Sequence, residues 1–193
     1  MNVPERPIIQ KIDTLTQSFY SFALYRLPWT DECTLVLQRH DEAEALDDIT
    51  CLNGKSGFVI APFHLSEKHP MVLIRPDATA TGWESIGNVL SYEVENAILQ
   101  PEKCHFTNQK VPLFENPLHK VPENYQESFE RFIKPLQKKS FRKLVLSRSE
   151  THPLTKDFSP LIAFVKACNN YPRMMIYLCH TPQTGTWMGS TPE

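Results

Sequence analysis

The sequence predicts an α+β fold, in which a largely antiparallel sheet carries helices packed on its outer face. Two patterns support this prediction: short runs of β-branched and aromatic residues bounded by Pro, Asp or Gly, and longer segments with apolar residues every three or four positions. In the C-terminal third these patterns alternate as helix, strand, helix and hairpin, which is typical of a sheet with helices on one face. The 193 residues, 41% of them hydrophobic, are enough for one domain with a buried core.

The first half of the chain contains one expected helix, at residues 8–20, and several expected strands. The strands are "SFALYRLP" (21–28), "CTLVLQRH" (33–40), "GFVIAPF" (57–63) and "MVLIRP" (71–76). Farther along, "YEVENAILQ" (92–100) is a candidate helix, and the prolines of "NQKVPLFENPLHKVP" (108–122) indicate a loop.

A helix with one apolar face is predicted after Pro122, because proline favours the first turn of a helix. The apolar positions recur at steps of one, three and four residues, as one face of an α-helix requires. They are Tyr125, Phe129, Phe132, Ile133 and Leu136. We expect this face to be buried in the core.

A second amphipathic helix is predicted over residues 159–170. Asp157 and Ser159 are candidate N-caps, and Pro160 suits the first helical position. The apolar face of this helix consists of Leu161, Phe164, Val165 and Cys168. The strands predicted around it are "FRKLVLSRSE" (141–150), "RMMIYLCH" (173–180) and, after the turn "TPQTG" (181–185), the returning strand "TWMGS" (186–190).

Net charge and the absence of targeting signals limit the cellular locations and the classes of ligand that we expect. The formal net charge is −2 and the pI is about 6.4, so the chain has no overall attraction for nucleic acid or for acidic membranes. The N-terminus lacks the apolar core of a signal peptide, and no apolar run approaches the roughly 18 residues of a membrane span. The five scattered cysteines show no metal-binding spacing and are expected to be reduced and mostly buried. We therefore expect a cytoplasmic protein.

Several other patterns have simpler explanations than a ligand site. The segment "NGKSG" (53–57) ends like a phosphate-binding loop, but Ile49 stands where that loop needs its first glycine, so a turn is favoured. The acidic run "HDEAEALDD" (40–48) lacks the spacing of a calcium loop and is expected to be solvated surface. The basic residues of "KPLQKKSFRK" (134–143) complement a helix C-terminus, and the histidines form no catalytic or zinc-binding pattern.

Lys143 and Glu193 are the residues that carry candidate chemistry. With the two-residue alternation of its expected strand, Lys143 shares one face with Val145 and Ser147. Glu193 follows a different strand and an expected Gly-Ser-Thr-Pro turn at residues 189–192. A lysine and a glutamate on two strands of one sheet can face each other across a pocket, one accepting a proton and the other donating one.

These segments resemble the chorismate-utilising enzymes, and among them the isochorismate synthases. The specific part of the resemblance is "FRKLVLSR" (141–148) with "WMGSTPE" (187–193), because both motifs and the fifty positions from Lys143 to Glu193 agree. "FALYRLP" (22–28) and "GFVIAPF" (57–63) also resemble the N-terminal half of that group. The resemblance covers the whole chain and implies about half of the chorismate-binding enzyme fold.

The resemblance implies roles for individual residues. Lys143 matches the general base that activates a water to attack C2 of chorismate, and Glu193 matches the general acid that protonates the C4 hydroxyl as it leaves. A closed, dry pocket would favour the neutral lysine and the protonated glutamate that these roles need. Arg148, Gly189 and Thr191 are the substrate-binding candidates, although a structural role, in a salt bridge or in the turn before Glu193, is the favoured interpretation for each.

The lysine also distinguishes among the relatives. The resemblance implies that anthranilate synthases, which use ammonia, usually lack a lysine at this point, whereas isochorismate and salicylate synthases keep it. We therefore expect an isomerase that makes isochorismate for menaquinone, siderophore or salicylate biosynthesis. Salicylate synthase or another chorismate-utilising enzyme is the alternative.

The resemblance further implies groups that lie outside these residues. The Mg²⁺ ligands of family members lie beyond the glutamate matched by Glu193, so no metal ligand is expected in this chain. Residues 1–193 are then expected to be the N-terminal part of a chorismate-binding domain, truncated after the general-acid motif and inactive alone. Exposed sheet edges would favour a homodimer. A non-catalytic truncated binding module is the competing hypothesis.

Overall fold

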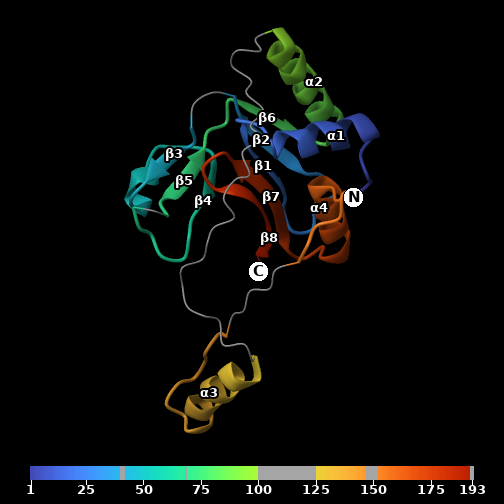
Figure 1. Cartoon of the computed structure of the whole chain (residues 1–193). Helices are drawn as coiled ribbons and strands as arrows, with labels where there is room; N and C mark the ends of the chain where they lie inside the picture. Colours follow the sequence, from blue (N-terminus) through green and yellow to red (C-terminus); the bar gives the residue numbers. More distant parts are fainter. Residues whose placement is uncertain (40–41, 68, 100–124, 147–151, 192–193) are drawn as a thin grey trace. The chain divides into compact units, whose positions relative to one another are not determined.

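The chain forms two compact units in a computed structural model, which describes residues 1–39, 42–67, 69–99, 125–146 and 152–191 (Figure 1). The first unit comprises Met1–Val111 and Ser159–Glu193. The second unit comprises Pro112–Phe158. The second unit is therefore an insertion between two sequence segments of the first.

The first unit contains two antiparallel sheets. The larger sheet has the strand order β6-β2-β1-β7-β8, and the smaller sheet has the order β3-β5-β4. The strands are β1 (Ser21–Arg26), β2 (Thr34–Gln38), β3 (Glu44–Leu46), β4 (Phe58–Ile60), β5 (Met71–Ile74), β6 (Ala78–Thr81), β7 (Met175–Thr181) and β8 (Gly185–Thr191). Every neighbouring pair is antiparallel, which confirms the predicted sheet type.

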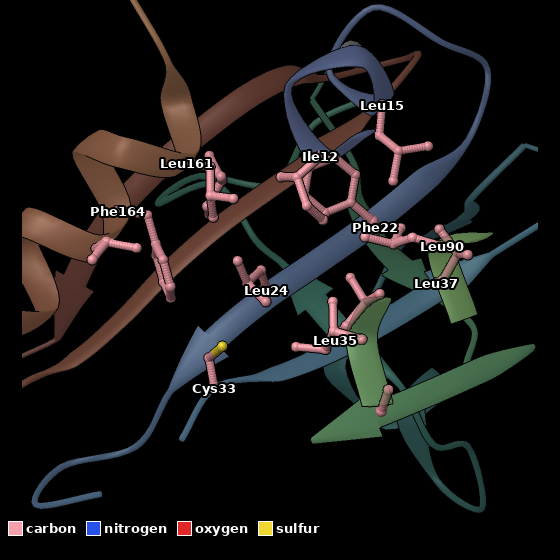
Figure 2. Close-up of a cluster of buried hydrophobic side chains, with 14 of the residues drawn as sticks. Ile12, Leu15, Phe22, Leu24, Cys33, Leu35, Leu37, Leu90, Leu161 and Phe164 are labelled. Atoms are coloured by element: carbon pink, nitrogen blue, oxygen red, sulfur yellow. The ribbon is translucent and has the colours of Figure 1, made fainter. Parts of the chain in front are cut away.

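Helices cover one face of the larger sheet, as the sequence predicts. They are α1 (Arg6–Leu15), α2 (Trp83–Leu99) and α4 (Pro160–Asn170) (Figure 1). Figure 2 shows the main core between them and the sheet, which includes Ile12 and Leu15 of α1, Phe22 and Leu24 of β1, Leu35 and Leu37 of β2, Leu90 of α2, and Leu161 and Phe164 of α4. No helix in the described ranges combines the length and apolar content that a bilayer crossing requires.

The smaller sheet covers the opposite face of the larger sheet. Ala23, Val36 and Cys179 of the larger sheet pack against Val72 and Ile74 of β5 in a second core. The first unit is therefore built of three layers: helices, a five-stranded sheet and a three-stranded sheet. The far side of the small sheet holds a third cluster, made of Leu46, Met71 and Leu73 and bordered by Leu52 of the short 3-10 helix η1 (Ile49–Leu52) and by Val59.

The N-terminus of α4 is capped by two side chains. The Oγ of Ser159 accepts a hydrogen bond from the Ile162 amide at 3.1 Å, which confirms the predicted cap. The Asp13 carboxylate of α1 accepts a second one from the Leu161 amide at 3.0 Å. These acceptors satisfy amide groups that the helix itself cannot pair, so they fix where α4 begins.

The C-terminus of α4 is held by Arg26, whose side chain is almost fully buried. Its guanidinium donates hydrogen bonds of 2.8–3.3 Å to the backbone carbonyls of Leu27, Cys168, Tyr171 and Pro172. Three of these carbonyls belong to the end of α4 and the loop that follows it, where helix carbonyls lack partners. Among the described residues this cation has no carboxylate partner, so its burial is compensated mainly by backbone carbonyl dipoles.

The second unit contains one described helix, α3 (Tyr125–Gln137), which confirms the predicted helix but not its burial. No side chain of α3 is buried, and Tyr125 and Phe129 are 47% and 43% exposed. The prediction that this apolar face belongs to a core is wrong for the described residues. The described part of this unit contains no second helix or sheet that would cover it.

The strand predicted at residues 141–150 is a second correction. Residues 141–146 form no strand, and residues 147–150 lie outside the described part of the chain. The Leu-Val-Leu centre has a strand-forming composition, but a strand also needs a neighbour to satisfy its backbone groups. The described residues of the second unit contain no other strand that could supply those hydrogen bonds.

The cysteines agree with the predicted reduced and mostly buried state where they are described. Cys33, Cys168 and Cys179 are buried free thiols, whereas Cys51 is exposed and Cys104 lies outside the described residues. Burial raises the pKa of Cys33 and of Cys179 to about 12, which keeps both thiols protonated and unreactive at neutral pH.

Candidate functional site

Three of the five predicted site residues lie in the described part of the chain. Gly189 and Thr191 lie in β8, and Lys143 lies in the second unit. Arg148 and Glu193 lie outside the described residues. The structure thus places Gly189 and Thr191 on one strand, whereas the predicted pair of Lys143 and Glu193 lies only partly within the described residues.

Strand β8 continues through residues that were predicted to form a turn. It runs from Gly185 to Thr191 and pairs with β7 along its whole length, with Met175 opposite Thr191 at the far end. The turn expected at residues 189–192 is therefore wrong for residues 189–191. Pairing with β7 holds this segment extended, so Gly189 acts within a strand.

The face of β8 that carries Gly189 also carries Trp187 and Thr191, because side chains alternate along a strand. This face points toward the smaller sheet: Tyr177 lies opposite Gly189 in β7, and its ring packs against Phe58 of β4 with centroids 6.0 Å apart. In the described residues β8 is an edge of the larger sheet. The candidate substrate-binding residues Gly189 and Thr191 therefore lie on an accessible strand.

Gly189 lies directly against Tyr177, so a side chain added at position 189 would require the tyrosine ring or the strand to move. A Cβ added to Gly189 would lie 2.6 Å from Cζ of Tyr177 and 3.0 Å from its Cε1, with the hydroxyl oxygen closer still. The ring of Tyr177 thus occupies the space that any side chain at position 189 would need. Phe58 supports this ring and in turn stacks on Tyr25 at 5.9 Å, so three aromatic rings connect the two sheets beside β8.

The turn before β8 is fixed by side-chain hydrogen bonds, which confirms the turn predicted at residues 181–185. The Thr181 Oγ1 accepts a hydrogen bond from the Thr184 amide at 3.0 Å. The indole Nε1 of Trp187 donates to the Thr184 carbonyl at 2.7 Å. Gly185 has a φ of 76°, a left-handed conformation that glycine adopts without strain. The start of β8 is therefore well defined.

His180 anchors the same hairpin on the helix-covered face of the sheet. Its Nε2 lies 3.2 Å from the Ser18 carbonyl and its Nδ1 lies 2.9 Å from the Thr186 hydroxyl. A carbonyl oxygen can only accept, so Nε2 carries the proton and Nδ1 accepts from Thr186. Burial lowers the pKa of His180 and keeps the ring neutral at pH 7. No catalytic role was expected for this histidine, and its contacts here are structural.

Lys143 is an exposed side chain beyond the end of α3. Among the described residues its ammonium group makes no hydrogen bond and no ion pair. Lys134, by contrast, lies in the last turn of α3, where a cation complements the helix dipole as expected. The described residues of the second unit leave Lys143 accessible to a ligand but do not form the dry pocket that the sequence led us to expect.

Sequence reasoning missed Tyr177, although the signal was present. The turn at residues 181–185 fixes the hairpin register, and counting outward from it places Tyr177 opposite Gly189. A large aromatic residue opposite a glycine is a recurrent way to cover exposed strand backbone. The pairing therefore follows from the sequence once the hairpin is assumed, whereas the contact with Phe58 does not.

Metal binding finds no support in the described ranges, where no group of three or more His, Cys, Asp or Glu side chains can hold a metal ion. Part of the acidic run at residues 40–48 instead forms β3, and Glu44 makes an ion pair with Lys55. The described residues therefore do not fit a Mg²⁺ site.

Taken together, the described residues define an α+β protein whose candidate substrate-binding residues lie on an accessible edge strand of a three-layered unit. A family model described as "Chorismate binding enzyme" matches residues 7–193. The chain therefore belongs to the chorismate binding enzyme family, which confirms the resemblance at the level of the family and indicates an enzyme that uses chorismate. No curated protein and no solved structure matches the chain.

Proposed function

We propose that the protein is an isochorismate synthase, which converts chorismate to isochorismate. A water attacks C2, the two ring double bonds each shift by one position, and the C4 hydroxyl leaves. Lys143 is the proposed base that takes a proton from the attacking water, and Glu193 is the proposed acid that gives a proton to the departing hydroxyl. One water is consumed and one is released, so the net reaction is an isomerisation.

The family match carries this proposal, because residues 7–193 include both proposed catalytic positions. Two further features support it. The lysine motif "FRKLVLSR" and the glutamate motif "WMGSTPE" stand fifty positions apart from Lys143 to Glu193, as in the isochorismate synthases that the sequence resembles. The exposed Lys143 ammonium is also free of protein partners among the described residues, which suits a group that must meet a substrate or a water.

Mg²⁺ is the proposed cofactor, since chorismate carries carboxylates whose charge a divalent cation would neutralise. The described residues do not fit a site for this ion, so none of the steps assigned to Lys143 or Glu193 depends on it. Loss of turnover with a chelator, restored by added Mg²⁺, is the direct check of this cofactor.

The decisive experiment compares Lys143→Ala with Lys138→Ala, an exposed lysine of the same segment, in the protein expressed from its whole gene. Chorismate and Mg²⁺ are supplied, and the products are separated by chromatography. We expect isochorismate from the parent protein and from Lys138→Ala, and a loss of roughly 10²–10⁴-fold in kcat for Lys143→Ala, the usual contribution of a general base.

The products also separate this proposal from its alternatives. Salicylate with pyruvate would identify a salicylate synthase, and anthranilate formed with ammonia would contradict the role of Lys143. Chorismate binding without any turnover, unchanged by Lys143→Ala, would support a non-catalytic binding module instead. Lys143 is exposed, so Lys143→Ala should leave the free energy of unfolding unchanged, and a folded but inactive variant points to catalysis.

A further inference from the structure

We propose that Tyr177 is a substrate-binding residue whose hydroxyl donates a hydrogen bond to a carboxylate of chorismate. The inference rests on the proposed function, because that function names the ligand. It concerns the face of β8 that carries Gly189 and Thr191, the two substrate-binding candidates that lie on a described strand. Tyr177 lies on the same face of the neighbouring strand β7, directly opposite Gly189.

The first argument is the direction of the phenol ring. Of the Tyr177 atoms near a Cβ built on Gly189, the hydroxyl oxygen is the closest, followed by Cζ at 2.6 Å and Cε1 at 3.0 Å. The ring therefore extends from β7 toward β8, with its hydroxyl end over the glycine. Because β8 is an edge strand in the described residues, this end of the ring lies at the open side of the sheet. Glycine also adds no side chain that could cover the hydroxyl.

The second argument is that the Tyr177 hydroxyl has no hydrogen-bond partner among the described residues. Fully buried polar groups are almost always paired, so an unpaired hydroxyl is expected to remain in contact with solvent or with a ligand. Tyr177 is half-buried, and in the described ranges only the Ser21 hydroxyl is both unpaired and closed off from solvent. The Tyr177 hydroxyl is therefore free to bind a ligand that reaches this edge of the sheet.

The third argument is the chemistry of this face. Burial, with a smaller effect of Cys179, raises the pKa of Tyr177, so the phenol stays protonated and can donate a hydrogen bond at neutral pH. A carboxylate only accepts hydrogen bonds, and its charge strengthens them. The Thr191 hydroxyl lies on the same face and offers a second donor. Neither β7 nor β8 contains an acidic residue that would repel a carboxylate.

The fourth argument is that the phenol ring is already held in place. Its ring packs against Phe58 of β4 with centroids 6.0 Å apart, and Phe58 stacks on Tyr25 of β1 at 5.9 Å. A side chain fixed in this way loses little conformational freedom when a ligand binds, so more of the hydrogen-bond energy is available for affinity. The aromatic contacts therefore suit Tyr177 to ligand binding.

The test is Tyr177→Phe in the protein expressed from its whole gene, because this change removes the hydroxyl and keeps the ring. KM for chorismate should rise by about tenfold or more, as expected for the loss of a hydrogen bond to a charged group. We expect kcat to change by less than about threefold, since the same contact exists in the ground state and in the transition state. The urea midpoint should stay unchanged, because the hydroxyl pairs with no described protein group.

Tyr25→Phe is the matched control. Tyr25 lies opposite Tyr177 in β1 and stacks on the same Phe58, but it is one strand farther from the edge and is not among the atoms nearest to Gly189. Removal of its hydroxyl should leave KM within about twofold of the parent value. An equal rise of KM in both tyrosine variants would overturn the specific role of Tyr177.

The outcomes distinguish this inference from the function on which it rests. An unchanged KM in Tyr177→Phe would overturn the contact with chorismate, while turnover by the parent and its loss in Lys143→Ala would still support the proposed function. If the parent binds chorismate without turnover, the proposed function fails and titration calorimetry with chorismate decides the inference. Weaker binding by Tyr177→Phe would then support the contact, and equal binding would overturn it. No binding of chorismate by the parent would overturn both.

Discussion

The first unit buries whole side chains between three layers, whereas the second unit leaves every side chain of α3 at least partly exposed. The helices of both units have amphipathic sequences, so the difference does not arise from the local pattern. It arises because α4 has a sheet to cover and α3, among the described residues, has none. An apolar stripe predicts a helix, but its burial depends on a partner surface.

The proposed catalytic residues are divided between these two units. Glu193 belongs to the first unit, after a strand that pairs with β7, and Lys143 belongs to the second. The acid therefore follows an edge strand that is paired along its whole length on one side, while the base lies on a segment whose described residues include no buried side chain. Substitutions that compare the two units test this contrast.

The largest expected effect comes from matched phenylalanine substitutions in the two units. Phe164→Ala in α4 removes a ring with 0% exposure and should lower the free energy of unfolding by about 3–5 kcal/mol. Phe129→Ala in α3 removes a ring that is 43% exposed and should change it by no more than about 0.5 kcal/mol. Urea unfolding measures both, and a large loss in Phe129→Ala would show that α3 has a buried face after all.

A smaller effect is expected from the buried arginine. Arg26→Met leaves carbonyls at the end of α4 without their donor and should cost about 2–3 kcal/mol of unfolding free energy. Arg26→Lys should restore only part of the lost unfolding free energy, because a lysine ammonium cannot reproduce the planar set of donors on the guanidinium. Arg131→Met, at an exposed position of α3, is the control and should have almost no effect on the urea midpoint. Equal losses in the two variants would contradict the capping role of Arg26.

The smallest expected effect is a pH dependence of stability that arises from the buried His180 of the first unit. Burial lowers the pKa of His180, so the unfolded chain binds a proton at a higher pH than the folded protein does. The stability contributed by the neutral ring is complete above the unfolded pKa of about 6.5 and declines as the pH falls below it. His180→Gln should reduce the drop in urea midpoint between pH 7.5 and 5.5. An unchanged drop in His180→Gln would contradict this assignment.

Much of the first unit follows from local sequence. The strands at β1, β2, β5 and β7 are strongly apolar or β-branched runs, and Ser159 with Pro160 marks the start of α4. The short strands β3 and β6 could not be predicted in this way, because Glu44–Leu46 and Ala78–Thr81 lack an apolar run. They are strands because β5 and β2 pair with them.

In the candidate site, too, local sequence predicts which residues matter but not the contacts that depend on distant parts of the chain. The motifs point to Lys143, Gly189 and Glu193, and the hairpin register can be counted from its turn. The reason for the glycine could not be predicted, because it depends on Phe58 holding the ring of Tyr177 from another sheet. The turn expected at Gly189 failed for a related reason: strand pairing overrides the local preference of a glycine-containing segment.

The central position of β1 has a consequence for synthesis on the ribosome. One edge of β1 pairs with β2, which follows it closely in the sequence. The other edge pairs with β7, where Phe22 lies opposite His180, so this pairing cannot form until the chain has been synthesised as far as β7. At roughly 5–20 residues per second, translation needs on the order of 8–30 s to produce that partner. During this interval β1, in which five of the six residues are buried in the folded protein, has one edge of unpaired backbone groups and exposed apolar side chains. Unpaired strand edges and exposed apolar surface promote aggregation. Slow codons between β1 and β7 should therefore lower the soluble yield more than slow codons before β1.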